Sequence, residues 1–530
     1  MAAPLFGFTQ TAAVTYSLLT TNDVTGLTVW LDSSDITTIT LGTGSNVTNW
    51  TDKKNNYSFS NTSGSYPTQL SNTFGVNFAN GGGCNGPVGL VYFNTWYLPT
   101  QNFTVFCVNN PTTTSQYNGA FGFVTASTAS RPNLFFIIQN GTQEKTSCLT
   151  DYNGSVWSTY ISASNNVVVS VGTTRVDELI NTSSTATTGI WTNGTLNTYS
   201  NAYTASNYTS SYSNYPANRS VLGASSTAWG SRSFTGNIYE VAVYNRALTS
   251  TERTNLETYY RLKWMFSPTQ YTSNVYWFDA ADTSTITASG SNVTAWANKG
   301  TASMIYSSNT GTVTTGTATK NGRNVISFTT SSKLVSNSVS LAISGNDETI
   351  FLVYQKRANF TTGGGIDLMY AINPDPIGNP NGSFLYYNAI AYGKDLTNNS
   401  NYYDMFWTVC GGFCFTAEGN TPTYSPYVYQ LLTLQVSANG SSNQGFWFFG
   451  GSNPGYGSAP GQYLDGCGYG YSGSLAMTFD MGKSTVDWDI AEYIVYNRVL
   501  TQSERQNVEG YLSIKWGIPL TPAHPYSTNI

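Results

Sequence analysis

Two stretches of the chain read almost alike. Residues 238–264 are IYEVAVYNRALTSTERTNLETYYRLKW, and residues 490–516 are IAEYIVYNRVLTQSERQNVEGYLSIKW. They align without a gap and are identical at 15 of 27 positions. An opening pattern recurs as well, because WLDSSDITTIT begins at Trp30 and WFDAADTSTIT begins at Trp277. Each copy thus opens with one shared segment and closes with the other, so the chain is a tandem duplication.

Each closing segment predicts a strand followed by a capped helix. Thr249 and Glu252, three residues apart, form a capping box, in which the hydroxyl accepts a backbone amide and the carboxylate reaches back. Thr501 and Glu504 repeat this pattern. Elsewhere, short aromatic or β-branched runs separated by Gly, Asn, Ser and Thr indicate strands and turns. These runs are residues 103–108, 134–138, 167–171, 350–354, 431–435 and 446–449.

The pattern predicts an all-β fold of two tandem antiparallel jelly-roll β-sandwiches, each closed by a short C-terminal amphipathic helix. A length of 530 residues agrees with two domains, since single cores stop growing near about 250–300 residues. We predict an N-terminal arm over 1–22, a first sandwich over 23–266, a second over 267–520 and a C-terminal tail over 521–530.

The composition narrows the classes of function. Only 9% of residues are charged and the net charge is −5 without a basic stripe, which disfavours nucleic-acid binding. No run approaches the roughly 20 apolar residues of a membrane span, so we expect no membrane insertion. Residues 1–8 lack the basic and apolar pattern of a secretory signal, and we expect none.

The single histidine, His524, lies six residues from the end. We therefore expect no imidazole inside either fold, which excludes serine or cysteine triads and histidine-ligated zinc. The six cysteines divide three and three between the halves, and buried free thiols are the favoured interpretation. Carboxylates, Tyr, Lys and Cys remain as groups for chemistry.

The closing segments resemble the end of a concanavalin A-like lectin/glucanase or laminin-G-like domain, with a G-x-I-x-E strand at Gly236 and a terminal K-W at Trp264 and Trp516. The W-[LF]-D-x-x-D opening is similar to the start of the same family. The resemblance implies two-sheet jelly rolls that bind glycans or proteins, a minority of which hydrolyse polysaccharides. Uncharged Asn/Ser/Thr-rich tandem copies also resemble surface proteins of large DNA-virus particles, assembled in a host cytoplasm.

If the chain is a hydrolase, Asp489 and Glu492 are the candidate catalytic pair, because retaining hydrolysis needs two carboxyl groups about 5–5.5 Å apart. Strict alternation along the strand places them on opposite faces unless a bulge intervenes. The first copy has Glu240 at the position of Glu492, which favours a structural role for both glutamates instead. Glu240 would pair with Arg246 and Glu492 with Arg498, or each glutamate would contact the helix that follows it.

The opening segments carry the candidate metal ligands. If calcium is bound, its ligands are Asp32 and Asp35 in the first copy, and Asp279 and Asp282 in the second. We favour another interpretation, in which the first Asp accepts backbone amides in a turn and the second caps a short helical turn. On that interpretation there is no cofactor.

Aromatic side chains are the candidate glycan-binding groups, since sugar C–H faces stack on exposed rings. The candidates lie near Asn, Thr or Gly, and they are Trp96, Tyr97, Trp191, Trp229 and Trp407. Burial in the core is the simpler fate of each one taken singly.

The sequence thus predicts a non-enzymatic structural or glycan-adhesive surface protein, a virion capsid-associated or fibre component located on the virion surface. Its partners would be glycans or other surface or capsid proteins, and we expect a homo-oligomer, in which avidity multiplies weak contacts. Two alternatives stay open: a polysaccharide-degrading glycoside hydrolase of the same fold, and a double jelly-roll capsid subunit.

Overall fold

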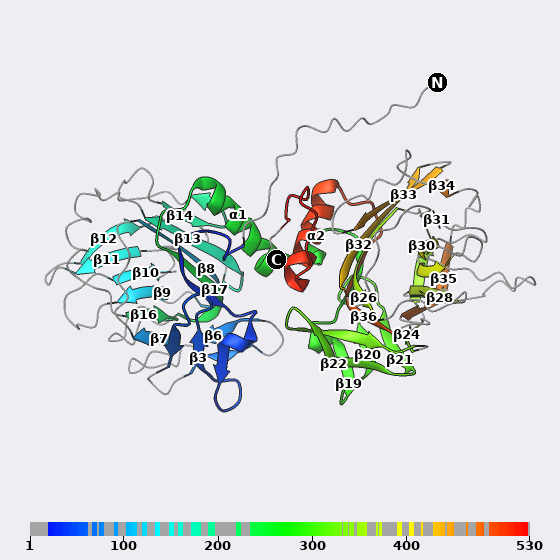
Figure 1. Cartoon of the computed structure of the whole chain (residues 1–530), viewed down its shortest axis with the longest axis horizontal. Coiled ribbons are helices and arrows are strands. Elements are labelled where there is room, and N and C mark those ends of the chain that lie inside the picture. Colours follow the sequence, from blue (N-terminus) through cyan, green and yellow to red (C-terminus); the bar gives the residue numbers. More distant parts are fainter. Residues whose placement is uncertain are drawn as a thin grey trace, which may run out of the picture. The chain divides into compact units, whose positions relative to one another are not determined.

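The computed structural model divides the chain into two compact units, with the division between Phe266 and Ser267 (Figure 1). The first unit is described from Thr20 and the second as far as Ser527. The structure describes residues 20–61, 66–70, 74–78, 90–93, 102–113, 119–124, 133–137, 148–152, 157–162, 171–181, 189–196, 219–223, 234–330, 332–337, 339–343, 347–357, 367–368, 370–373, 389–394, 402–407, 415–416, 428–439, 442–449, 463–464, 473–481 and 487–527.

The first unit is an antiparallel β-sandwich. An 8-stranded sheet has the order β15-β14-β13-β8-β17-β6-β5, with β1 also paired to β17, and a 9-stranded sheet has the order β12-β11-β10-β9-β16-β7-β4-β3-β2. The strands are β1 Leu27–Asp32, β2 Ile39–Leu41, β3 Val47–Thr51, β4 Ser58–Ser60, β5 Thr68–Gln69, β6 Val76–Phe78, β7 Leu90–Phe93, β8 Phe103–Pro111, β9 Gly119–Val124, β10 Asn133–Ile137, β11 Cys148–Tyr152, β12 Trp157–Ser162, β13 Arg175–Asn181, β14 Gly189–Thr192, β15 Thr195–Leu196, β16 Arg219–Leu222 and β17 Gly236–Tyr244.

The second unit repeats this arrangement around β36, which pairs with β18, β23 and β26 as β17 pairs with β1, β6 and β8. Its main sheet is 15-stranded, and a 4-stranded sheet has the order β27-β29-β30-β31. The strands are β18 Asn274–Asp279, β19 Ile286–Ser289, β20 Asn292–Ala297, β21 Ile305–Thr310, β22 Val313–Lys320, β23 Arg323–Phe328, β24 Lys333–Ser336, β25 Val339–Ile343, β26 Glu348–Lys356, β27 Asp367–Leu368, β28 Tyr370–Asn373, β29 Ala389–Lys394, β30 Tyr402–Trp407, β31 Phe415–Thr416, β32 Gln430–Asn439, β33 Ser442–Phe449, β34 Tyr463–Leu464, β35 Gly473–Met481 and β36 Trp488–Tyr496.

The chain is all-β with two tandem jelly-roll sandwiches, as the sequence predicts. The runs predicted as strands coincide with β8, β10, β26, β32 and β33, while the run at 167–171 lies outside the described residues except for its last position. In the first unit, Val105 and Val243 of one sheet and Trp50 and Phe121 of the other belong to one buried cluster. The apolar core therefore lies between the two sheets, where burial supplies the main stabilisation.

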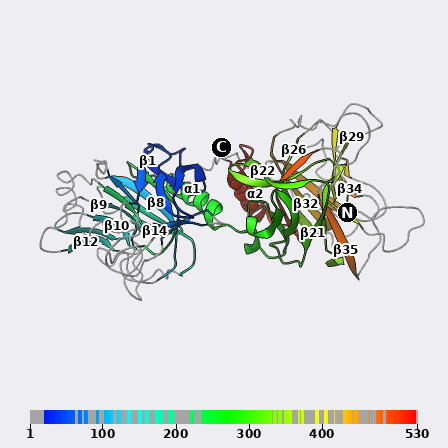
Figure 2. The same cartoon turned by 90° about the horizontal axis from the view of Figure 1, so that it is seen from below.

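A helix closes each unit. Helix α1 (Ser250–Tyr260) continues as a π-helical turn, η4 (Arg261–Met265), and lies on the outer face of the β8 and β13 sheet (Figures 1 and 2). The rings of Phe106 and Tyr260 meet there, 5.3 Å apart. Helix α2 is Gln502–Trp516, and short 3-10 turns are η1 Ile36–Thr38, η5 Pro268–Gln270 and η6 Thr283–Thr285. Both predicted capping boxes are confirmed, each with its hydroxyl and its carboxylate bonded reciprocally to backbone amides.

A bulge interrupts the central strand of each unit at the same place. On β17, Ile238 pairs with Asn109 but Glu240 pairs with Val108, so Tyr239 is the extra residue. On β36 the register shifts in the same way at Ala491. A bulge reverses the alternation of faces. Glu240 and Glu492 therefore point toward the outer face of the sheet, where the closing helix lies.

The prediction that neither fold contains an imidazole is wrong. The side chain of His524 is fully buried in the second unit, and its Nε2 lies 3.0 Å from Oε2 of Glu509 on α2. The amide of Tyr526 donates to Nδ1 of His524, and the Tyr526 hydroxyl donates to Asn507 of the same helix. The position of His524 near the end suggested a tail outside the fold, but these bonds attach the described part of 521–530 to α2.

Candidate functional site

The opening and closing segments of each copy meet across two neighbouring strands. Asp32 at the end of β1 faces Glu240 of β17, and Asp279 of β18 faces Glu492 of β36. Two carboxylates placed side by side repel each other unless cations lie between them. The residues that supply those cations complete the site in each unit.

All four acceptor positions of Glu240 are used. Its Oε1 accepts from Nε1 of Trp30 at 2.7 Å and from the hydroxyl of Thr21 at 3.0 Å. Its Oε2 accepts from Nζ of Lys263 at 2.8 Å and from Nε1 of Trp264 at 2.7 Å. A carboxylate has about four lone-pair sites, so none is left for a substrate or a metal ion.

Glu492 is satisfied in the same way in the second unit. Its Oε1 accepts from Nε1 of Trp277 at 2.7 Å and from the hydroxyl of Tyr511 at 2.9 Å. Its Oε2 accepts from Nε1 of Trp516 at 2.7 Å and from Nζ of Lys515 at 2.8 Å. The tryptophans of the opening and closing motifs thus bind the same carboxylate, which explains why both motifs contain one.

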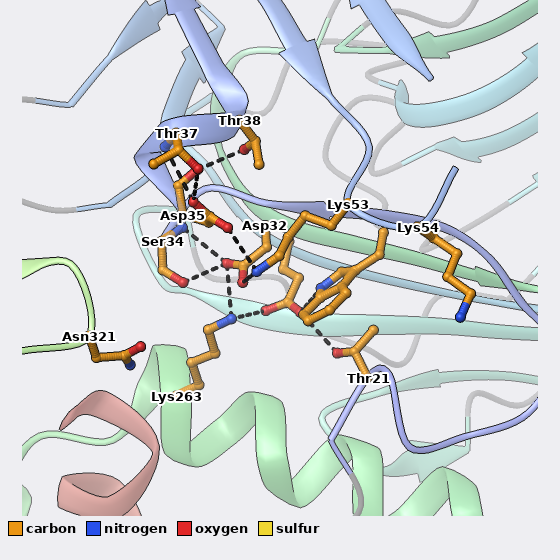
Figure 3. Close-up of polar contacts among 12 residues, drawn as sticks. Thr21, Asp32, Ser34, Asp35, Thr37, Thr38, Lys53, Lys54, Lys263 and Asn321 are labelled. Carbon is orange, nitrogen blue, oxygen red and sulfur yellow. Dashed lines mark hydrogen bonds and ion pairs between the residues drawn. The ribbon is translucent and has the colours of Figure 1, made fainter. Parts of the chain in front are cut away.

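In the first unit, two lysines link the carboxylates of Asp32, Asp35 and Glu240 (Figure 3). Nζ of Lys263 lies 2.9 Å from Asp32 as well as bonding Glu240, and Nζ of Lys53 lies 3.3 Å from Asp32 and 3.1 Å from Asp35. We call these five residues the first carboxylate cluster. The ammonium of Lys53 lies between the two aspartates.

The second carboxylate cluster has the same form. It consists of Asp279, Asp282, Lys299, Glu492 and Lys515. Lys515 lies 2.7 Å from Asp279, while Lys299 lies 3.2 Å from Asp279 and 2.7 Å from Asp282. The geometry recurs because two tryptophans and a lysine donate to the glutamate in both units.

The electrostatics favour ionised aspartates in both clusters, because the pKa of each is lowered. Burial alone would raise the pKa of Asp32, but the ammonium groups of Lys263 and Lys53 outweigh it and hold that pKa below its usual value. Burial would lower the pKa of Lys263, and Asp32 and Glu240 raise it instead. In the second unit, burial raises the pKa of Glu492, and neighbouring Asp279 adds to that effect.

The aspartates also make the local bonds expected of turn-forming residues. Oδ1 of Asp32 accepts from the amide of Ser34, and Asp35 caps η1 through the amide of Thr37. Asp282 caps η6 in the same way. With a lysine ammonium between each pair, the oxygens proposed for calcium already have cationic partners. Within the described residues, no group of three His, Cys, Asp or Glu side chains is placed to hold a metal ion.

The bulge at Ala491 changes the position of the candidate hydrolase pair. Asp489 pairs with Gln355 and Glu492 with Val353, which are two residues apart on β26, so both carboxylates lie on one face. They have separate partners, however. Asp489 accepts from Ser327 at 2.6 Å and lies 3.2 Å from Nε of Arg357. Burial raises the pKa of Asp489.

The proposed arginine partners of the two glutamates are not the ones observed. Arg246 pairs with Glu252 of the capping box at 2.6 Å, and Arg498 pairs with Glu504 at 2.8 Å. The alternative, contact with the closing helix or the turn that continues it, is the one observed. The contacts are made by the Lys-Trp pair of each copy.

The candidate aromatic platforms do not gather at one place in the described structure. Trp191 on β14 is half-buried, and the guanidinium of Arg253 lies 5.0 Å from its ring. Trp407 ends β30. Trp96, Tyr97 and Trp229 lie outside the described residues.

The sequence analysis overlooked the four lysines, although a signal for them was present. Lys263 and Lys515 belong to the repeated K-W, and Lys53 and Lys299 follow the opening aspartate of each copy after a similar interval. A lysine at matched positions in both halves of a chain with so few charges indicates a fixed partner.

Comparisons with known proteins give fold likenesses at low scores. The chain is similar to a native heptameric pentraxin from Limulus polyphemus (14% identity, 34% of this chain and 78% of that chain, TM-score 0.26). It is also similar to the Ruminococcus gnavus IT-sialidase CBM40 bound to sialyllactose (13% identity, 34% of this chain and 92% of that chain, TM-score 0.26). A third similar structure is of botulinum neurotoxin type C, whose cell entry is described as dependent on two ganglioside molecules. It has 11% identity, covers 88% of this chain and 97% of that chain, and gives a TM-score of 0.29. No family model and no curated protein matches the chain.

Proposed function

We propose that the chain is a non-enzymatic surface protein whose two sandwiches are scaffolds for binding glycans or partner proteins, as a virion capsid-associated or fibre component. One observation carries the non-enzymatic part. Glu240 in the first unit and Glu492 in the second each accept four internal hydrogen bonds. The neighbouring aspartates, Asp32 and Asp279, each bind two lysines. The duplicated acidic residues therefore fasten strands to a helix.

Composition and duplication support the adhesive part. Two scaffolds in one chain, multiplied by homo-oligomerisation, convert weak contacts into avidity. A chain with 9% charged residues also has little long-range repulsion between copies crowded on one surface. In the described residues no helix has the length and apolar character of a membrane span, which agrees with attachment through protein contacts.

Trp191 is the described side chain best suited to contact a sugar. Its ring is half-buried next to Arg253, and Asn193 and Gly194 follow it in a tight turn of positive φ. An indole that offers one face to solvent can stack on sugar C–H groups, while neighbouring amide groups bind hydroxyls.

We expect purified full-length protein to bind a subset of glycans on an array, and Trp191→Ala to weaken that binding about tenfold. Val428→Ala is the matched control, because Val428 is an apolar side chain, 52% exposed, in the other unit. Absence of binding to every glycan, or equal weakening by both variants, would contradict the glycan-adhesive proposal.

Labelling with an antibody against the chain tests the proposed location on the virion. The proposal requires signal on the particle surface.

The hydrolase alternative has one observation in its favour, the shared face of Asp489 and Glu492. A reducing-sugar assay on laminarin or alginate tests it. We expect no product from the unaltered chain. Product that disappears in Asp489→Asn, with binding retained, would replace the proposal by the hydrolase.

A further inference from the structure

A buried arginine in the first unit lacks partners for most of its donors. Arg175 begins β13, and its side chain is 4% exposed. Its Nε lies 2.9 Å from Oδ2 of Asp177 and donates to Oδ1 of Asn109 at 3.3 Å. The two terminal amino groups, Nη1 and Nη2, are buried without a hydrogen-bond partner in the part of the chain that the structure describes. Buried donors left unpaired are costly, so this guanidinium is incomplete as it stands.

The groups around Arg175 fix its orientation and leave its terminal edge without hydrogen-bond partners among the described residues. Asp177 accepts from Nδ2 of Asn109 at 2.9 Å and from the hydroxyl of Thr192 at 3.1 Å. The carboxylate is thus held by three donors on the Nε side of the guanidinium. The opposite edge, made by Nη1 and Nη2, presents parallel N–H groups, which is the geometry that binds a carboxylate through both oxygens.

The second unit has no such group at the same place. Strand β32 pairs with β26 as β13 pairs with β8, so Gln430 and Leu432 take the register positions of Arg175 and Asp177. There the hydroxyl of Tyr354 donates to Gln430 at 3.0 Å, and the pair is neutral. The fold therefore does not require a buried ion pair at this position, since apolar or neutral groups serve as well.

We propose that the terminal edge of Arg175 binds the carboxylate of a small organic acid, such as an acidic sugar, inside the first unit. A carboxylate matches the edge in charge, in planarity and in its two acceptor oxygens. Residues 171–173, which precede β13 by one residue, are exposed, so Arg175 stands close in the chain to the point where it reaches solvent.

This site is independent of the proposed function. Trp191 and Thr192 are adjacent on β14, so their side chains point to opposite faces. Asp177 and Thr192 point between the sheets, and Trp191 points toward α1, where Arg253 lies. Loss of one site therefore leaves the other intact, and the two tests can fail separately.

Isothermal titration of the full-length chain with D-glucuronate, acetate, D-glucose and inorganic phosphate tests the proposal. We expect glucuronate to bind once per chain with a dissociation constant on the order of 1 mM, and glucose not to bind. If acetate binds as tightly as glucuronate, the carboxylate alone is recognised. If acetate binds more weakly than glucuronate, the sugar ring is also contacted. Two sites per chain, binding of phosphate only, or no binding of either acid would overturn the proposal.

The variants are chosen so that the fold survives. Arg175→Gln/Asp177→Leu copies the pair found in the second unit, and we expect it to fold and to weaken glucuronate binding by more than about tenfold. Arg175→Lys keeps the charge without the two-donor edge and should weaken binding about tenfold. The control is Arg261→Gln, which removes a guanidinium that is 57% exposed and should leave binding unchanged. Unchanged binding in Arg175→Lys and in the double variant would show that the acid binds elsewhere.

Discussion

Replacing Glu492 by glutamine is expected to lower the free energy of unfolding of the second unit by about 3–5 kcal/mol. The amide keeps the size of the side chain but removes the charge that balances Lys515. It also offers a donor where four donors already converge from Trp277, Tyr511, Lys515 and Trp516. One or more of these buried groups loses its partner, and that loss is the source of the expected effect.

Denaturant unfolding followed by tryptophan fluorescence measures this loss. The matched control is Glu504→Gln, because Glu504 pairs with Arg498 at 2.8 Å but remains 23% exposed. We expect the control to cost about 1 kcal/mol, from the cap and a weak surface pair. A double variant, Glu492→Gln/Lys515→Met, should recover part of the loss, since it removes an ammonium that has lost one of its two carboxylate partners. Equal losses for Glu492→Gln and the control would contradict a structural role for the cluster.

The features that could be predicted from sequence are those that repeat or act over short distances. The capping boxes need only Thr249 with Glu252 and Thr501 with Glu504, which are three residues apart. The strands follow from alternation, and the duplication follows from matched segments. These signals do not depend on knowing which distant residues meet.

The faces of the central strands could not be predicted, because one inserted residue reverses them. The bulge residue is Tyr239 in the first unit and Ala491 in the second, and these side chains share no property that marks a bulge. Alternation therefore placed Asp489 and Glu492 on opposite faces, and the structure places them on the same one. For the same reason, the meeting of Glu492 with the closing helix could not be read from spacing.

The repeat also concealed differences between the copies. No predicted run or motif includes Arg175 or Asp177, and comparison of the halves drew attention only to positions that agree. The structure shows that a position where the halves differ, Arg175 against Gln430, carries the unpaired donors. Likewise His524 follows the second copy and has no counterpart to indicate that it packs on α2.

The outer face of β13 carries a second departure from the repeat, with a pH-dependent consequence. Glu178 is fully buried against α1, and its Oε2 lies 3.2 Å from Arg253. Its Oε1 has no hydrogen-bond partner among the described residues. Thr433 takes its position in the second unit. Burial raises the pKa of Glu178 from 4.5 to about 8, Arg253 opposes that rise, and neighbouring Glu257 adds to it.

The sign of the effect follows from proton binding. Between about pH 4.5 and 8 the folded state holds a proton on Glu178 that the unfolded state has released, so stability falls as pH rises through this window. Glu252 behaves oppositely, because its hydrogen bond to Arg246 lowers its pKa to about 2, and its contribution is lost as pH falls from 4.5 toward 2. The two residues thus predict slopes of opposite sign.

Glu178→Gln is therefore expected to stabilise the first unit by about 2–4 kcal/mol at pH 8 and to have little effect near pH 4. The amide resembles the protonated acid, so the variant removes the cost of ionising a buried carboxyl while keeping its shape. Denaturant unfolding at pH 2, 4, 6 and 8 measures the difference, with Glu252→Gln as the control that should destabilise at pH 8 and much less near pH 2. A Glu178→Gln variant less stable than the unaltered chain at pH 8 would show that Arg253 holds this carboxylate ionised, because only an ionised group gains enough from that guanidinium to offset its burial.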